Sequence, residues 1–256
     1  MKKIVVIYLF VMIYVFLPVR SLFAQEHIEV GIDEKLGAYL PMDEIFVTSD
    51  GDSVKLSQVI DKPTLLALVY YECPGLCAPL LTELSWVVGK IDLKAGEDYQ
   101  VVSLSFDHHE TPEIANKWKT DYFKGMKNPI PEKAWTFLTG DSVTIKKLTD
   151  IAGFYFKPDE KEFVHAGTLI SISPEGKISR YVFGTQFNPF DLKMALLEAK
   201  AGKTSPTISK ILEFCFSYDP GGRKYTLNVT RIIGSIMLVG VGIFFGVLTL
   251  KKKKKN

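Results

Sequence analysis

Short apolar runs alternate with amphipathic segments through the middle of the chain. Residues 64–71 (TLLALVYY) and 99–106 (YQVVSLSF) are almost continuously apolar, which is typical of strands covered on both faces. A third strand is predicted at residues 135–138. The segment at 77–90 carries apolar residues broadly at helical spacing, and the segment at 111–123 opens with Thr-Pro-Glu, a helix-start signal. We therefore expect the first two strands each to lead into a helix.

Two hairpins and two further helices complete this pattern. Residues 45–56 predict an edge hairpin around the turn SDGD, and residues 168–183 predict another around PEG. One helix is expected to begin at Asp141 or Ser142 and to end near Gly153, and the last spans residues 189–200. This order predicts an α/β protein with a mixed sheet flanked by helices, which is the thioredoxin-like fold.

The N-terminus has the pattern of a secretory signal peptide, which we place at residues 1–24. It combines Met1-Lys2-Lys3, an apolar run at residues 4–17 and small residues up to Ala24. The apolar run is short for a bilayer, which needs about 20 residues. Its length therefore favours cleavage over an uncleaved anchor.

The C-terminus predicts a transmembrane helix at residues 232–250. This stretch is uncharged, and the lysines at 251–255 follow it directly. By the positive-inside rule, the basic tail at 251–256 is then cytoplasmic. A domain at residues 25–203 and a tether at 204–231 would lie on the extracytoplasmic (periplasmic) side of the cytoplasmic membrane.

Amino-acid composition excludes few classes of function. The chain has 256 residues, of which 47% are hydrophobic and 23% charged, as in an ordinary globular protein with one sizeable domain. The formal net charge of +2 depends on the terminal lysine run, so the rest of the chain is slightly acidic. This charge distribution does not favour nucleic-acid binding.

The segment YYECPGLCAP carries the candidate chemistry. It holds Cys73 and Cys77, two of the three cysteines, where the first buried strand leads into a helix. A helix N-terminus stabilises anions, so we expect the pKa of the Cys73 thiol to be lowered. A structural disulfide is common for paired cysteines in secreted proteins, but a bridge across so short a loop removes little chain entropy.

Thiol–disulfide exchange and metal binding both suit this position. The redox motif of this fold has two residues between its cysteines and a proline before the facing strand, whereas here there are three residues, and His165 precedes that strand. Residues four apart share one face of a helix, so both sulfurs can converge on one ion. Thiolates select Cu(I), and an added imidazole also accommodates Cu(II). Cys73, Cys77 and His165 are therefore candidate copper ligands.

Motifs spread over about residues 41–201 recur together in one known family. They are SDG at 49–51, CPxxC at 73–77, VSLSFD at 102–107, TPE at 111–113, WTFLTG at 135–140, GF at 153–154, His165, PEGK at 174–177 and RY at 180–181. In this order they resemble the Sco/SenC family, thioredoxin-fold copper proteins that help assemble the copper centre of cytochrome c oxidase.

The resemblance implies that Cys73, Cys77 and His165 bind a copper ion, Cu(I) or Cu(II). The implied partner is the copper-containing subunit of a respiratory oxidase, with other copper carriers or thiol reductants as further partners. A membrane-tethered metallochaperone is favoured over an enzyme. The alternative is a thiol-disulfide oxidoreductase that reduces the oxidase copper-site cysteines, with Cys73 and Cys77 as its redox pair. A peroxiredoxin has the same fold but would carry a threonine where Tyr70 stands.

Five further residues lie near the motifs or outside the domain. Asp107 matches an acidic position near the family's site, in the second shell or at a partner surface, and Glu110 stands where the family often has a second aspartate. His108 and His109 could bind copper transiently, but adjacent residues point in different directions, which favours a solvated loop. Cys215 lies in the tether, where packing is its expected role.

Overall fold

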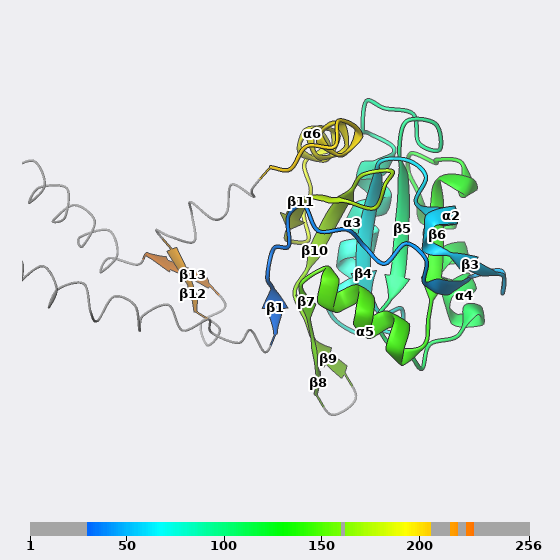
Figure 1. Cartoon of the computed structure of the whole chain (residues 1–256), viewed down its shortest axis with the longest axis horizontal. Coiled ribbons are helices and arrows are strands. Elements are labelled where there is room, and N and C mark those ends of the chain that lie inside the picture. Colours follow the sequence, from blue (N-terminus) through cyan, green and yellow to red (C-terminus); the bar gives the residue numbers. More distant parts are fainter. Residues whose placement is uncertain (1–29, 160–161, 206–215, 220–223, 228–256) are drawn as a thin grey trace, which may run out of the picture.

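A seven-stranded mixed sheet forms the body of the computed structural model, which describes residues 30–159, 162–205, 216–219 and 224–227 (Figure 1). The strand order is β11-β10-β4-β5-β6-β2-β3. The parallel strands at its centre are β4 (Thr64–Val69), β5 (Gln100–Ser105) and β6 (Trp135–Thr139). The antiparallel strands on either side are β2 (Ile45–Thr48), β3 (Ser53–Lys55), β10 (Thr168–Ile172) and β11 (Ile178–Phe183).

Helices cover both faces of this sheet. Figure 1 shows α3 behind the sheet and α5 in front of it. The longer helices are α3 (Cys77–Val88), α4 (Pro112–Gly125), α5 (Ser142–Ile151) and α6 (Pro189–Lys200). The short ones are α2 (Leu56–Val59) and the 3-10 turn η2 (Glu132–Ala134). The predicted α/β, thioredoxin-like arrangement is confirmed.

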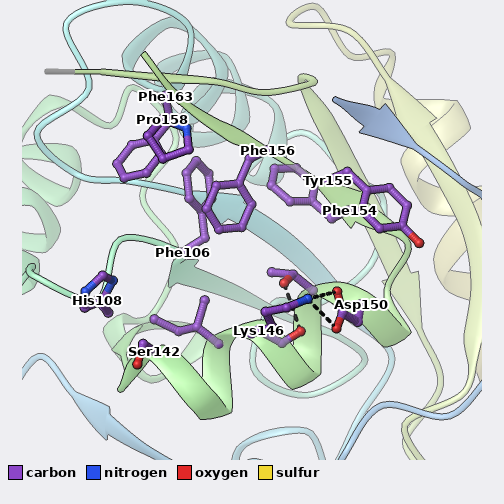
Figure 2. Close-up of a pocket in the computed structure, with 12 residues that line it drawn as sticks. Phe106, His108, Ser142, Lys146, Asp150, Phe154, Tyr155, Phe156, Pro158 and Phe163 are labelled. Carbon is purple, nitrogen blue, oxygen red and sulfur yellow. Dashed lines mark hydrogen bonds and ion pairs between the residues drawn. The ribbon is translucent and has the colours of Figure 1, made fainter. Parts of the chain in front are cut away.

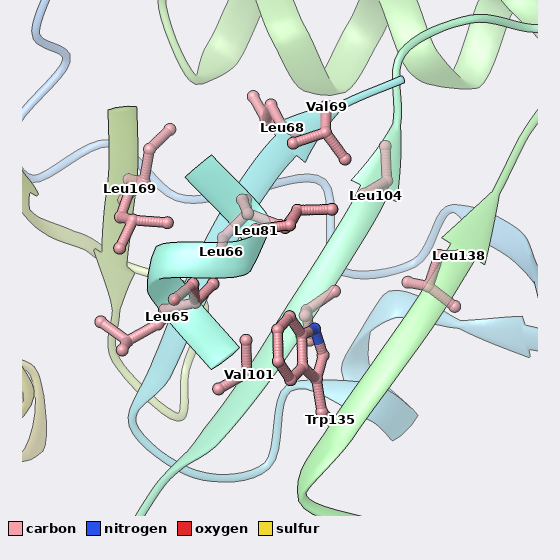
Figure 3. Packing of buried hydrophobic residues seen from close by; sticks show 14 of the residues in the cluster. Leu65, Leu66, Leu68, Val69, Leu81, Val101, Leu104, Trp135, Leu138 and Leu169 are labelled. Carbon is pink, nitrogen blue, oxygen red and sulfur yellow. The ribbon is translucent and has the colours of Figure 1, made fainter. Parts of the chain in front are cut away.

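The two central strands form the floor of the hydrophobic core. Every residue of β4 and β5 is buried, because helices cover both faces of the sheet and each of these strands has a neighbouring strand on both sides. Figure 3 shows Leu81 of α3 beside Leu66, and Val101 of β5 beside Trp135, its partner on β6. Burial of each such side chain stabilises the fold by about 1.5–3 kcal/mol. This packing fixes the strand ends from which the candidate site is built.

The boundaries of α5 follow the residues that predicted them. The Asp141 side chain accepts hydrogen bonds from the backbone N–H groups of Val143 and Thr144, as an N-cap does. The helix ends just before Gly153, whose φ of +60° places it in the left-handed region. A Cβ there would lie 1.9 Å from the carbonyl oxygen of Asp33, so only glycine fits.

Several short elements were not predicted from the sequence. They are β1 (Gly31–Ile32) paired with β7 (Phe154–Tyr155), the hairpin of β8 (Lys157–Asp159) and β9 (Glu162–Val164), α2, and the hairpin of β12 (Phe216–Asp219) and β13 (Lys224–Leu227). Strands this short carry too few residues to show an alternating pattern. The β8–β9 hairpin is the one that matters for the site, because it leads directly into His165.

Predictions at the chain ends fall outside the described residues. These are the signal peptide (1–24), the transmembrane helix (232–250), the basic tail (251–256), most of the tether and Cys215. Among the helices of the described ranges, none combines the length and apolar character that crossing a membrane requires.

Candidate metal centre

Three segments meet at the carboxyl end of strand β4. Cys73 lies in the loop after β4, Cys77 is the first residue of α3, and His165 lies between β9 and β10. Strand β10 runs antiparallel to β4, with Leu169 opposite Ala67, so its start lies beside the carboxyl end of β4. The sheet therefore brings His165 to the cysteines, although it follows Cys77 by 88 residues.

The three predicted ligands converge. Sγ of Cys77 lies 3.3 Å from Nε2 of His165, and the ligand atoms of all three residues lie within 4.8 Å of one another. Both cysteines are free thiols and are buried, with exposed fractions of 6% for Cys73 and 1% for Cys77. His165 is half-buried. The group therefore sits at the edge of the core, with the imidazole on its open side.

The cysteines converge, but for a different reason from the one that the sequence suggested. Because α3 begins at Cys77, Cys73 is not on the helix, and the two do not share a helical face. Instead the loop turns back, and the backbone N–H groups of Gly75 and Cys77 donate to Sγ of Cys73 at 3.4 and 3.3 Å. Cys73 thus receives donors at the start of the helix, which is an anion-stabilising position.

The two thiols have opposite electrostatic environments. The pKa of Cys73 is lowered, chiefly by a hydrogen bond from the Cys77 thiol and further by His165, which together outweigh its burial. The pKa of Cys77 is raised, first by burial and then by its hydrogen bond to Cys73. The predicted thiolate at Cys73 is supported, and a single negative charge is stabilised on the pair.

A carbonyl group and a shell of aromatic rings orient His165. Its Nδ1 lies 3.1 Å from the carbonyl oxygen of Ala166, so Nδ1 carries a proton and Nε2 faces the sulfur. The rings of Phe106, Tyr70 and Phe154 lie 5.1, 5.9 and 6.1 Å from the imidazole centroid. Such a shell restricts water and fixes the ring in place.

An open groove lies beyond this aromatic shell. It has a volume of about 330 Å³ and is bordered by Phe106, Phe154 and Phe163, with His108 at one end (Figure 2). Neither cysteine nor His165 lines it. The groove is therefore a neighbour of the candidate site and not its entrance.

Glu110 supports the loop in a way that sequence reasoning missed. Its carboxylate accepts hydrogen bonds from the backbone N–H groups of Tyr71 (2.8 Å) and Glu72 (2.7 Å), the two residues before Cys73. Its side chain is buried, and burial raises its pKa against the opposing effect of the Ser105 hydroxyl and these N–H groups. The sequence showed an acidic residue before Thr-Pro-Glu but carried no signal of its burial.

The remaining predicted residues form a separate cluster. Oδ1 of Asp107 lies 2.8 Å from Nδ1 of His109 and also accepts the His109 backbone N–H at 3.0 Å. A second-shell role for Asp107 at the Cys-Cys-His group stays a prediction. The expectation that His108 and His109 point apart is wrong, because their ring centroids are 3.9 Å apart. The turn after β5 brings both rings to one side.

Comparison with known proteins relates this geometry to one family. No model of a known protein family matches the chain. A SCO1 protein homolog of Bacillus subtilis (strain 168) is 25% identical over 152 residues, which are 57% of this chain and 75% of that protein. The predicted resemblance to the Sco/SenC family is confirmed.

Solved structures agree with the fold described above. A protein of Aquifex aeolicus VF5, provisionally described as an electron transfer protein, matches with a TM-score of 0.59 and 28% identity over 65% of this chain and 95% of its own. ScoI of Arabidopsis thaliana, solved with copper bound, matches with a TM-score of 0.52 and 19% identity over 64% of this chain and 97% of its own. At that identity the second match supports the Sco fold alone.

Proposed function

We propose that this chain is a membrane-tethered copper metallochaperone that acts outside the cytoplasm and assists assembly of the copper centre of cytochrome c oxidase. The observation that carries the proposal is the convergence of Cys73, Cys77 and His165, whose ligand atoms lie within 4.8 Å of one another. Copper is the cargo and not a resident cofactor. The confirmed family resemblance supports both the metal and the oxidase as its destination.

The residues present fit copper. Two ligands about 2.3 Å from one ion are at most about 4.6 Å apart, so small shifts would bring these three atoms onto a single ion. Thiolates are soft donors that select Cu(I), and the imidazole extends the set to Cu(II). Two thiolates and a neutral imidazole would leave bound Cu(II) uncharged, which suits a site whose sulfurs are buried.

The chain's own groups prepare the site for exchange. N–H groups of the loop and of α3 hold Cys73 as a thiolate, and the Ala166 carbonyl keeps Nε2 of His165 turned inward. Pro74 and Gly75 are exposed beside the buried sulfurs, so an acceptor can approach from that side. Three protein ligands leave a coordination position for an incoming ligand.

The location outside the cytoplasm and the oxidase partner rest on the sequence. The signal-like segment at 1–24, the apolar stretch at 232–250 and the lysine tail support a tethered domain on the periplasmic side. A chaperone held at the membrane surface meets a membrane-bound oxidase at high local concentration. This arrangement suits delivery to the copper-containing subunit.

Copper titration tests the proposal. The reduced full-length chain should bind one equivalent of Cu(I) in competition with a chelator, and Cys73→Ala, Cys77→Ala and His165→Ala should each weaken binding at least about tenfold. Cys215→Ala is the matched thiol control and should bind as the unmodified chain does. Absence of a stoichiometric complex, or equal binding by the three variants, would rule the proposal out.

Thiol–disulfide exchange is the second candidate, and one observation favours it. The lowered pKa of Cys73, set first by the Cys77 thiol, describes an attacking thiolate beside a resolving thiol. Oxidation of the pair to a disulfide would transfer two electrons to a disulfide in the oxidase copper site and leave two thiols there. This reaction needs no imidazole, so oxidase assembly supported by a His165→Ala chain would favour it over copper delivery.

A further inference from the structure

We propose that Asp107, His108 and His109 form a second metal site, separate from the Cys-Cys-His group, for a divalent transition-metal cation with Cu(II) bound most tightly. The three residues follow β5 directly and occupy one turn at the surface. The proposal concerns binding at this turn alone. It holds whether or not the Cys-Cys-His group carries copper.

The ligand atoms of this turn are already gathered. One donor atom from each of the three residues lies within 4.8 Å of the others, as in the Cys-Cys-His group. Among the described residues these are the two groups of this kind. The imidazole rings lie close together, with centroids 3.9 Å apart and planes inclined by 38°. The two imidazoles are therefore close enough to share one ion, with the Asp107 carboxylate beside them.

The backbone of Asp107 is held in place by hydrogen bonds on both sides. Its backbone N–H donates to the Ser105 hydroxyl at 3.1 Å, and its backbone carbonyl accepts from the Glu110 N–H at 3.2 Å. Oδ1 then meets Nδ1 of His109 at 2.8 Å. In metal sites, a histidine commonly donates one ring nitrogen to a carboxylate, and this bond leaves the other nitrogen free for the ion. Nε2 of His109 is thereby available.

The donor set selects the cation. Imidazole nitrogen and carboxylate oxygen suit divalent first-row metals, and within that series Cu(II) binds most strongly to a given set of such ligands. The group has no thiolate, so it lacks the soft donor that Cu(I) requires. The two groups on this domain therefore differ in the oxidation state that they favour.

Exposure indicates a site for exchange and not for storage. The side chain of His109 is 76% exposed and that of Asp107 is 18% exposed. Ions at such a site remain accessible to water and to other ligands. Phe106, the residue before Asp107, packs on His165 with ring centroids 5.1 Å apart. The turn is thus one residue away from the aromatic shell of the Cys-Cys-His group, and Figure 2 shows His108 at the end of the adjoining groove.

The experiment uses the full-length chain with Cys73→Ser, Cys77→Ser and His165→Ala, which removes the other metal group. Titration with Cu(II) alone should give one bound equivalent by chelator competition, with nitrogen hyperfine coupling in the electron paramagnetic resonance spectrum. Adding His108→Ala with His109→Ala should weaken binding at least about tenfold, and Asp107→Asn should weaken it about three- to tenfold.

The matched control is His27→Ala. The chain has four histidines, and His27 is the one that belongs to neither of the two metal groups. It should leave Cu(II) binding unchanged. Loss of binding in His27→Ala, or retained binding in the His108→Ala, His109→Ala chain, would overturn the proposal.

A second measurement tests the proposal even if the Cys73→Ser, Cys77→Ser, His165→Ala chain misfolds. The unmodified protein, first given one equivalent of Cu(I), should take up a further equivalent of Cu(II), and the His108→Ala, His109→Ala protein should not. Equal uptake of the second equivalent by both proteins would contradict the proposal. The substituted histidines are exposed, so circular dichroism should show an unchanged fold.

Discussion

Glu110 shows how one buried carboxylate positions the loop that leads to Cys73. Its two oxygens satisfy the N–H groups of Tyr71 and Glu72, which have no strand partner at the end of β4. In Glu110→Gln, one oxygen becomes an NH₂ group that faces an N–H. We expect the free energy of unfolding to fall by about 1–3 kcal/mol, the cost of leaving a buried donor unpaired. Urea denaturation measures this loss.

The neighbouring residue supplies the control for that prediction. Glu72 is exposed, so Glu72→Gln should change the free energy of unfolding by less than about 0.5 kcal/mol. If the two variants are equally stable, Glu110 does not support the loop as described. A parallel loss of Cu(I) affinity in Glu110→Gln alone would show that the support extends to the ligands.

The sequence predicted which residues form the Cys-Cys-His group but not how they meet. The identities of Cys73, Cys77 and His165 follow from a strand-to-helix turn, an unusual spacer and a family pattern. The hydrogen bonds to Cys73, the burial of Glu110 and the close approach of the His108 and His109 rings depend on how loops return to the sheet. Local sequence carries little information about such tertiary contacts.

At the scale of elements, long segments were predictable and short ones were not. Strands β4 and β5 are continuous apolar runs, and α5 carries both its N-cap and its terminal glycine. The β8–β9 hairpin has three residues in each strand and alternates too briefly to be recognised. That hairpin delivers His165, so the sequence supplied the ligand without the element that carries it.

The N-cap of α5 predicts a pH dependence of stability. Hydrogen bonds from the Thr144 N–H and hydroxyl, and from the Val143 N–H, lower the pKa of Asp141 below its usual value of 3.8. Because the folded-state pKa is depressed, the stabilisation is present above the unfolded pKa and is lost as the pH falls through the folded one. Asp141→Asn keeps the cap but does not titrate, so the advantage of the aspartate should shrink below about pH 4.

Denaturation of both chains between about pH 7 and pH 2.5 measures that difference. Asp52→Asn, at an exposed position, corrects for general effects of removing a negative charge. Parallel stability curves for Asp141→Asn and the unmodified chain over the whole range would contradict the prediction.

For the whole molecule, copper binding and folding should be one linked equilibrium. The ligands come from separate segments and are gathered only in the folded state, so copper stabilises that state by mass action. At a free Cu(I) concentration about 100 times the dissociation constant, the gain is about 2.7 kcal/mol, and the melting temperature should rise by about 5–10 °C. Differential scanning calorimetry of the reduced chain measures the shift. His165→Ala, with binding at least about tenfold weaker, should reduce the shift by about half or more, whereas an undiminished rise would show that copper stabilises the chain elsewhere.

The 88-residue separation of Cys77 and His165 gives this linkage a mechanical form. An ion held by both closes a loop that contains β5, α4, β6, α5 and the β8–β9 hairpin. The ion would thus act as a removable cross-link between the cysteine loop and the segment that follows the β8–β9 hairpin. Without the ion that constraint is absent, and the contacts of the protein itself, such as that of His165 with Cys77, hold the hairpin beside the cysteine loop. If the chain delivers copper as proposed, an acceptor would distinguish its loaded form from its empty form by stiffness as well as by charge.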